Sequence, residues 1–196
     1  MRKFKVFIPM FLILLLISGV VKPIITSESI SQKVFRLHIL ANSDSTQDQN
    51  LKLLVKDEIL KLSCDVFVNA KSVNEAKHIA DENKKAFENV AQKVIEDNGY
   101  TYKVSAYTDE EYFNTRKYDG FIMPAGEYST LKIVIGSGEG HNWWCVMYPA
   151  VCISACSDDF DKALTKEEKK LITSKKYIPK FKILEIINKI KNKINS

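Results

Sequence analysis

The chain has 196 residues, of which 45% are apolar and 27% are charged, a composition typical of one globular domain rather than a disordered protein. Its net charge of +5 is unevenly distributed, with +4 in residues 1–22, +8 in residues 162–196 and −7 between them. An acidic body with basic ends argues against nucleic-acid binding, because a nucleic-acid binder carries its basic charge on the folded face.

The N-terminal segment, residues 1–25, has the pattern of a signal peptide or an N-terminal membrane anchor. Three basic side chains within the first five residues precede an uncharged, largely apolar run at residues 6–21. Because basic residues stay on the cytoplasmic side of a membrane, we expect the rest of the chain to be exported. The cleavage pattern at residues 18–20 is poor and the run is short for a spanning helix, so cleavage and retention both stay open.

The next stretch predicts a strand and then a helix. Residues 34–40 alternate, and Phe35, Leu37 and Ile39 share one face, as in a strand packed on a core. Ser45 is suited to be the N-cap of the helix that follows. The apolar positions of this amphipathic helix recur at steps of three and four residues: Leu51, Leu54, Val55, Ile59, Leu62 and Val66.

A second amphipathic helix is predicted after Ser72. Ser72 and Glu75 match the capping box, in which each side chain accepts a hydrogen bond from an exposed backbone N–H. Asn98 and Gly99 supply a left-handed stop. The buried stripe of this helix is predicted to contain Ala76, Ile79, Ala80, Phe87, Val90, Ala91, Val94 and Ile95.

The second half of the chain predicts further strands. Residues 100–107 and 130–135 are typical of strands, whereas residues 108–128 are predicted to be irregular. Residues 136–140 form a glycine-rich tight loop, whose pattern and flanks are not those of a nucleotide-binding loop. The secondary structure of the apolar residues 141–149 is left open by their pattern.

Together these elements predict a single α/β domain over residues 30–157, a small sheet with two amphipathic helices packed on one face. The tail, residues 158–196, has the alternating isoleucines and lysines of a basic amphipathic C-terminal helix after Pro179. Such a helix can lie on an anionic membrane surface, bind a partner groove or dock on its own domain, and the sequence leaves these alternatives open.

Few side chains offer a catalytic set. His38 is predicted on the solvent side of its strand or facing a partner, and His141 follows the glycine loop. A thiol hydrolase would need Cys145 beside one of these histidines, with Asp44 or Asn142 orienting the ring. No cysteine-protease signature surrounds the cysteine, and an exported thiol is often oxidised.

A cell-wall hydrolase is the second enzymatic hypothesis. Glu127 and Glu139 flank one predicted strand and could act on a sugar, with Trp143 and Trp144 stacking on its rings. Alternatively, the first glutamate closes a turn and the second lies in a loop. The adjacent tryptophans should point to opposite faces of a strand, so we expect one to be buried and the other presented to another protein.

Four cysteines fit an exported protein, and they allow three pairings. Cys145, Cys152 and Cys156 cluster, so one disulfide among them is possible, while buried thiols are the alternative. Their spacings of seven and four residues contain no CxxC pair, so we predict no zinc site, and nothing in the sequence calls for a metal or cofactor.

Two blocks of sequence carry a family resemblance. The first is RLHILANSD at residues 36–44 with QNLKLLVKD at residues 49–57, and the second is GEY at residues 126–128 with GHNWWCV at residues 140–146. With the tail segment KFKILE at residues 180–185, they resemble the stage II sporulation protein R family. The resemblance runs from about Val34 to Cys152.

The resemblance implies a function. Such proteins are made in the forespore and exported into the space between the forespore and mother-cell membranes. There they activate a membrane-embedded aspartic protease that removes the pro-segment of the early mother-cell sigma factor, so the family member is a ligand and not an enzyme. A second cysteine, Cys156, departs from the family pattern, so no disulfide carries over from it. The motif positions expected to bind the partner or hold the fold are His38, Asn42, Asp44, Glu127, His141, Asn142, Trp143, Trp144 and Cys145.

Overall fold

The computed structural model describes residues 24–118, 120–149, 163–174 and 185–186. In chain order its elements are β1 (Phe35–Leu40), α2 (Thr46–Val66), α3 (Val73–Asp97), β2 (Val104–Phe113), β3 (Arg116–Lys117), β4 (Ile122–Met123), β5 (Gly126–Ile135), β6 (Asn142–Tyr148) and α5 (Lys166–Thr173). They belong to two compact units. Unit 1 consists of residues 1–31, 112–126 and 165–196, and unit 2 consists of residues 32–111 and 127–164.

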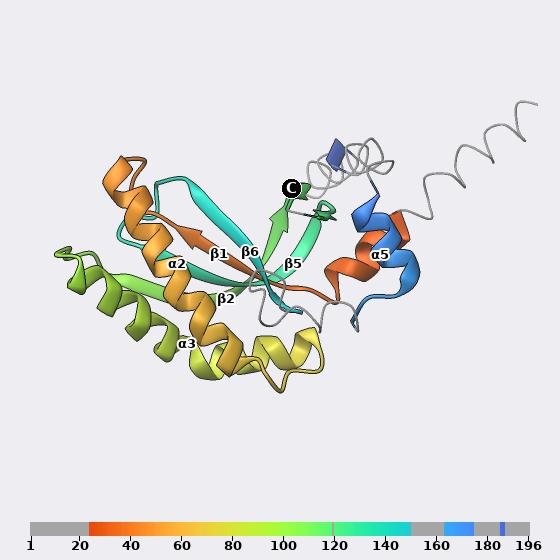
Figure 1. Ribbon diagram of the computed structural model, residues 1–196, viewed down its shortest axis with the longest axis horizontal. Helices are drawn as coiled ribbons and strands as arrows, with labels where there is room; N and C mark the ends of the chain where they lie inside the picture. Colours follow the sequence, from red (N-terminus) through yellow and green to blue (C-terminus); the bar gives the residue numbers. More distant parts are fainter. Residues whose placement is uncertain (1–23, 119, 150–162, 175–184, 187–196) are drawn as a thin grey trace, which may run out of the picture. The chain divides into compact units, whose positions relative to one another are not determined.

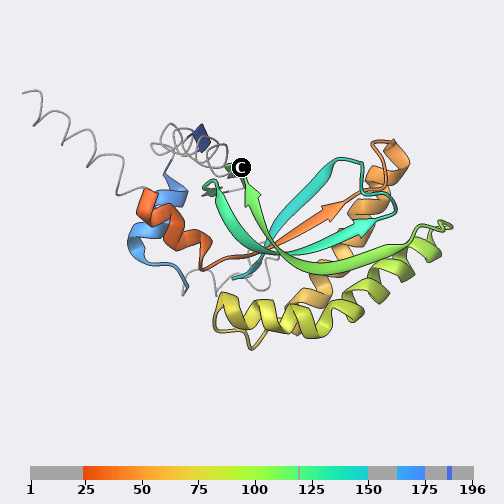
Figure 2. The same ribbon diagram turned by 180° about the vertical axis from the view of Figure 1, so that it is seen from behind.

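Unit 2 is built on a four-stranded mixed sheet in the order β2-β5-β1-β6. β1 pairs in parallel with β5 and antiparallel with β6. Helices α2 and α3 lie along one face of this sheet (Figures 1 and 2). The predicted α/β fold, with two helices on one face of a small sheet, is therefore confirmed.

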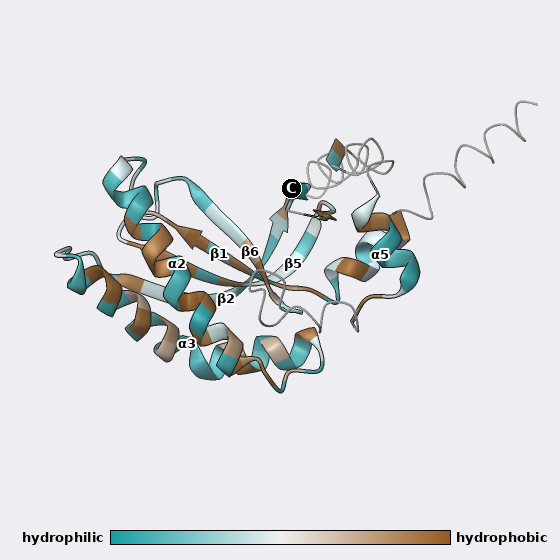
Figure 3. Ribbon diagram, in the orientation of Figure 1, coloured by the Kyte–Doolittle hydropathy of each residue, from teal (hydrophilic) through white to brown (hydrophobic). Residues whose placement is uncertain are grey.

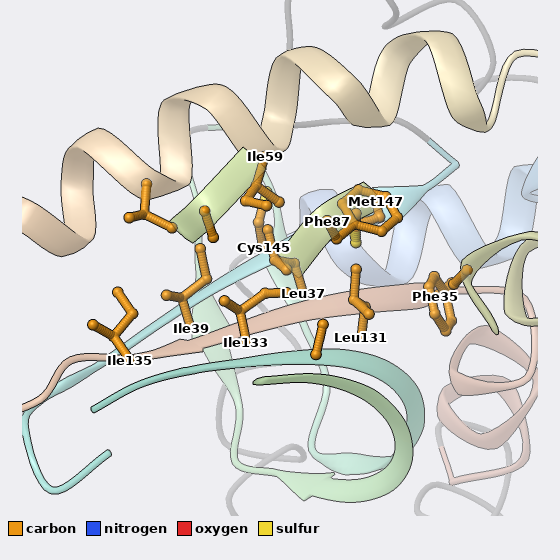
Figure 4. Close-up of a cluster of buried hydrophobic side chains, with 14 of the residues drawn as sticks. Phe35, Leu37, Ile39, Ile59, Phe87, Leu131, Ile133, Ile135, Cys145 and Met147 are labelled. Carbon is orange, nitrogen blue, oxygen red and sulfur yellow. The ribbon is translucent and has the colours of Figure 1, made fainter. Parts of the chain in front are cut away.

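The hydrophobic core of unit 2 lies between the sheet and its two helices (Figure 4). Phe35, Leu37 and Ile39 of β1 are all fully buried there, as their alternation predicted. In Figure 3, β1 is coloured hydrophobic along most of its length, while α2 and α3 alternate between hydrophobic and hydrophilic. The remaining labelled core side chains come from β5, β6 and the helices: Leu131, Ile133, Ile135, Cys145, Met147, Ile59 and Phe87.

Both helix starts were predicted, with two differences in detail. Ser45 caps α2, and Ser72 caps α3 by accepting from the backbone N–H of Glu75 at 3.2 Å. The Glu75 carboxylate accepts from the N–H of Lys71 at 2.7 Å, so the expected capping box is replaced by a bond one residue further out. Leu54, assigned to the buried stripe of α2, is 45% exposed because it lies on the flank of the helix.

The second half of the chain is more regular than its polarity suggested. β2 begins at Val104 and continues to Phe113, so the strand predicted over residues 100–107 starts later and runs into the stretch expected to be irregular. The short strands β3 and β4 pair within that stretch. The acidic residues of β2 misled the prediction, because a strand at the sheet edge can carry charged side chains without losing its pairing. The ambiguous stretch after the glycine loop forms β6.

Side chains of α3 cover the free edge of β2. The Gln92 side chain accepts from the N–H of Val104 at 3.2 Å, and the Glu88 carboxylate accepts from the N–H of Ala106 at 3.0 Å. Hydrogen bonds from Lys85 and from the strand backbone hold the pKa of Glu88 below its ordinary value. These helix side chains satisfy edge donors that would otherwise be available to a strand from another molecule.

Unit 1 joins segments that are far apart in the sequence. Residues 24–31 are helical, and Ser29 Oγ donates to Glu168 Oε1 of α5 at 2.7 Å. The backbone N–H of Thr115 donates to Glu185 Oε1 at 2.9 Å. The predicted signal and the basic tail helix otherwise lie outside the described residues. Within the described ranges, no helix has the length and apolarity needed to span a bilayer.

Replacing Glu88 with alanine is expected to lower the free energy of unfolding by about 1 kcal/mol, because the N–H of Ala106 loses its acceptor. Glu88→Gln keeps an amide oxygen at the same place and is expected to lose less. Lys85→Ala controls for the surface ion pair, which joins Lys85 Nζ and Glu88 Oε2 at 2.8 Å. Urea unfolding at pH 7 measures all three, and equal stability of the alanine and glutamine variants at position 88 would show that the edge contact contributes nothing.

Candidate functional site

Two loops of unit 2 interlock at one end of the sheet, and we call them the loop clasp (residues 41–45 and 136–141). The first loop follows β1, and the second joins β5 to β6. Leu40 at the end of β1 pairs with Val134 near the end of β5 and with Asn142 at the start of β6. The strand pairing therefore brings loop residues from both family-like blocks to the same end of the sheet.

Backbone hydrogen bonds join the two loops of the clasp. The N–H of Gly140 donates to the carbonyl of Ala41 at 2.9 Å. The side-chain oxygen of Asn42 accepts from the N–H of Ser137 at 3.0 Å, and the Asn42 carbonyl accepts from the Ser137 hydroxyl at 2.7 Å. Asn42 thus bonds to the second loop through both its backbone and its side chain.

Backbone angles and close contacts explain why glycine occupies three positions of the clasp. Gly136 and Gly138 have positive φ angles of 59° and 69°, which favour glycine. An added Cβ at Gly140 would lie 2.2 Å from the Ser43 carbonyl oxygen, and one at Gly136 would lie 2.2 Å from Asn42 Oδ1. The tight loop expected from the sequence is confirmed, and its glycines permit this approach of two backbones.

A buried carboxylate, Asp48 of α2, organises the first loop. Its Oδ2 accepts from Asn42 Nδ2 at 2.9 Å and from Ser43 Oγ at 2.6 Å. Burial by itself raises the pKa of Asp48, but the hydrogen bonds from Ser43, Asn42, Tyr102 and Ser45 outweigh it and lower the pKa. The ionised form is therefore the one that holds the loop.

A buried ammonium group holds the second loop. Lys52 is 5% exposed and donates from Nζ to the His141 carbonyl at 2.8 Å and to Gln49 Oε1 at 2.6 Å. Its burial lowers the pKa of Lys52, an effect that the charge of Asp44 opposes. Sequence reasoning singled out neither this lysine nor Asp48. Both fall on the buried stripe of α2, four residues apart, which was the available signal.

The side chains of Asp44 and His141 pair on the outer surface of the clasp. The Asp44 carboxylate contacts both the backbone N–H and the ring Nδ1 of His141. Their side chains are 56% and 79% exposed, respectively. Hydrogen bonds from His141, first from the ring and then from the backbone, lower the pKa of Asp44.

His38 belongs to a different cluster, on the sheet face turned away from the helices. It is 3% exposed, so the prediction that it lies on the solvent side was wrong. Its Nδ1 lies 2.7 Å from Glu111 Oε2 and its Nε2 lies 2.9 Å from Asn142 Oδ1, while Trp144 stacks on the ring at 5.5 Å. Lys132 Nζ is 3.6 Å from the same glutamate. These neighbours bury the imidazole in contacts between strands.

The remaining predicted residues are spread over unit 2. Trp143 packs against the core on the helix side of β6, under the ammonium of Lys56 at 5.6 Å, and neither tryptophan is fully buried or fully exposed. Cys145 is fully buried and disulfide-bonded. Cys152 and Cys156 lie outside the described residues, so the pairing stays a prediction.

The geometry separates the side chains that either hydrolase would need. Cys145 faces the helices, whereas His38 lies on the opposite face of the sheet, and a disulfide-bonded sulfur is no nucleophile. Glu127 lies at the start of β5 and Glu139 beyond its end. Eight residues of strand between Glu127 and Ile135 span about 26 Å, against about 5–10 Å between the carboxylates of a glycosidase.

The described residues also contain no cluster of three or more histidine, cysteine, aspartate or glutamate side chains placed to hold a metal ion. What the clasp does offer is a rigid surface, with two exposed polar side chains fixed at its centre. A preorganised surface of this kind suits recognition of another molecule.

Comparisons with known proteins give one consistent result. The family model for stage II sporulation protein R matches residues 31–158. A curated relative, stage II sporulation protein R of Bacillus subtilis (strain 168), is 33% identical over 145 residues. That match covers 71% of this chain and 65% of the relative, so the chain matches just under two thirds of the relative's length. No solved structure matches.

Gly140→Ala is expected to destabilise unit 2 by about 1–3 kcal/mol, because the new methyl group would collide with the Ser43 backbone. Gly99→Ala is the matched control. It has a φ of 80° but no neighbour within 4 Å, so it measures backbone strain without a collision. Thermal unfolding of both variants tests the clasp, and an unchanged melting temperature for Gly140→Ala would contradict the close approach.

Proposed function

Because this chain belongs to the stage II sporulation protein R family, we propose that it is an exported signal that activates a membrane-embedded aspartic protease. In this proposal the protease then removes the pro-segment of the early mother-cell sigma factor. The chain acts outside the forespore membrane, in the space between forespore and mother cell. It is a ligand and performs no chemistry of its own.

The observation that carries this proposal is how the family-like motifs are used. Several of their polar groups hold the two loops: the Asn42 side chain accepts from Ser137 of the second loop, and the Ser43 hydroxyl donates to Asp48. Cys145 is disulfide-bonded, and His38, one of the two histidines that a thiol hydrolase could use, lies on the opposite face of the sheet from it. Motif residues that build a rigid surface, without an assembled nucleophile and base, fit a binding protein better than an enzyme.

The difference in net charge between the two units supports contact of unit 1 with a membrane. Without residues 1–22, which belong to the predicted signal, the stretches of unit 1 contain twelve basic and five acidic side chains, giving +7. Those of unit 2 contain thirteen and nineteen, giving −6. Lys117, Lys166 and Lys170 of unit 1 are exposed, and so is Ile25, close after the apolar run. We propose that unit 1 rests on an anionic membrane surface, aided by the basic tail.

Deleting the gene is expected to leave the sigma-factor precursor uncleaved in sporulating cells, because the protease then lacks its activator. Restoring the full chain should restore cleavage, whereas the chain without residues 1–25 should not, since it is not exported. Immunoblots of the precursor measure the outcome. Normal cleavage without the gene would refute the proposal and bring the hydrolase hypotheses forward.

The chain lacking residues 1–23 is expected to sediment with vesicles that contain anionic lipid. Salt at 1 M should release it, because the Debye length is then about 3 Å and charges further apart no longer attract each other. Vesicles of neutral lipid are the control. Lys166→Glu combined with Lys170→Glu should weaken binding. Equal sedimentation with both vesicle types would show that charge is not the cause.

A further inference from the structure

His141 is exposed to solvent, yet both its backbone and its ring are held by neighbouring groups. Its side chain is 79% exposed, yet its N–H and ring contact Asp44 and its carbonyl accepts from Lys52. An exposed pair of this kind contributes little to stability, and fixing a side chain costs conformational entropy. Stability is therefore a weak reason for this arrangement.

The pairing also fixes the chemistry of the ring. An ionised carboxylate can only accept hydrogen bonds, so the Nδ1 beside Asp44 carries a proton. In the neutral imidazole the lone pair then lies on Nε2, on the opposite side of the ring. In this form of the ring, the exposed Nε2 is a hydrogen-bond acceptor of fixed position.

We propose that Nε2 of His141 is the contact through which the chain engages the membrane protease, and that it accepts a hydrogen bond from a donor group there. This inference rests on the proposed function and adds the atom and the chemistry of the partner. The donor is a hydroxyl, a backbone N–H or an ammonium group. Asp44 is a positioning residue, since it acts through the imidazole.

Amide substitutions separate the two ring nitrogens. The amide of His141→Gln reaches the place of Nε2 and can still accept there, whereas that of His141→Asn reaches only the place of Nδ1. Cleavage of the sigma-factor precursor in cells carrying each variant is the measurement. We expect His141→Ala and His141→Asn to reduce cleavage about tenfold and His141→Gln to retain much of it, as a hydrogen-bonding hot spot would.

Asp44→Ala tests the fixed ring. It removes the oxygen that accepts from Nδ1, so the neutral ring can carry its proton on either nitrogen. We expect this variant to fold and be exported normally and still to lose part of the cleavage that His141→Ala loses. Immunoblots of the exported chain and thermal unfolding of the purified variants establish the first part.

The control is a second exposed histidine. His78 of α3 is 74% exposed and lies 3.4 Å from Glu82 through Nε2, with no loop built around it. His78→Ala is expected to leave cleavage unchanged. If His141→Ala also left cleavage unchanged, or if the asparagine and glutamine variants lost it equally, this inference would be overturned while the proposed function stood. Failure of the wild-type chain to restore cleavage would instead refute the proposed function.

Discussion

Both loops of the clasp depend on the burial of one carboxylate. Asp48 is 4% exposed, and removing an ionised carboxylate from water is costly unless hydrogen bonds replace the water. Here Asn42 and Ser43 supply those bonds. The amide nitrogen of Asn42 is thereby fixed, which turns its oxygen towards the N–H of Ser137. One side-chain amide thus couples the start of α2 to the loop between β5 and β6.

The strand order makes this coupling possible. β1 lies between a parallel and an antiparallel neighbour, so its C-terminal end lies beside the end of β5 and the start of β6. The loops that leave this edge must then pass each other closely. Gly140 permits the approach, and the buried Lys52 fixes the far side of the second loop through the His141 carbonyl. Sheet topology, a missing side chain and a buried cation therefore act together.

Sequence patterns predicted the parts of the fold that obey a simple period or cap. Alternation identified the core face of β1, and Ser45 and Ser72 marked both helix starts. The same reasoning failed for β2, because an edge strand with acidic side chains looks irregular until its partner helix is known. It also placed His38 in solvent, since a strand pattern cannot show that the second face of a sheet is buried. Resemblance to a family identified the motifs but could not show which of their residues support the fold and which are free to contact a partner.

That division changes how loss of function in this family should be interpreted. A substitution at Asn42 or Gly140 would disturb the clasp from within, so an inactive variant there reports on folding and not on contact. His141 differs, because its ring is exposed and contacts Asp44, while its backbone carries the bonds that hold the loop. A side-chain change at this position can thus leave the clasp intact. A motif can therefore match the family closely because it builds a surface, and in our proposal the partner contacts only the few atoms that this surface presents.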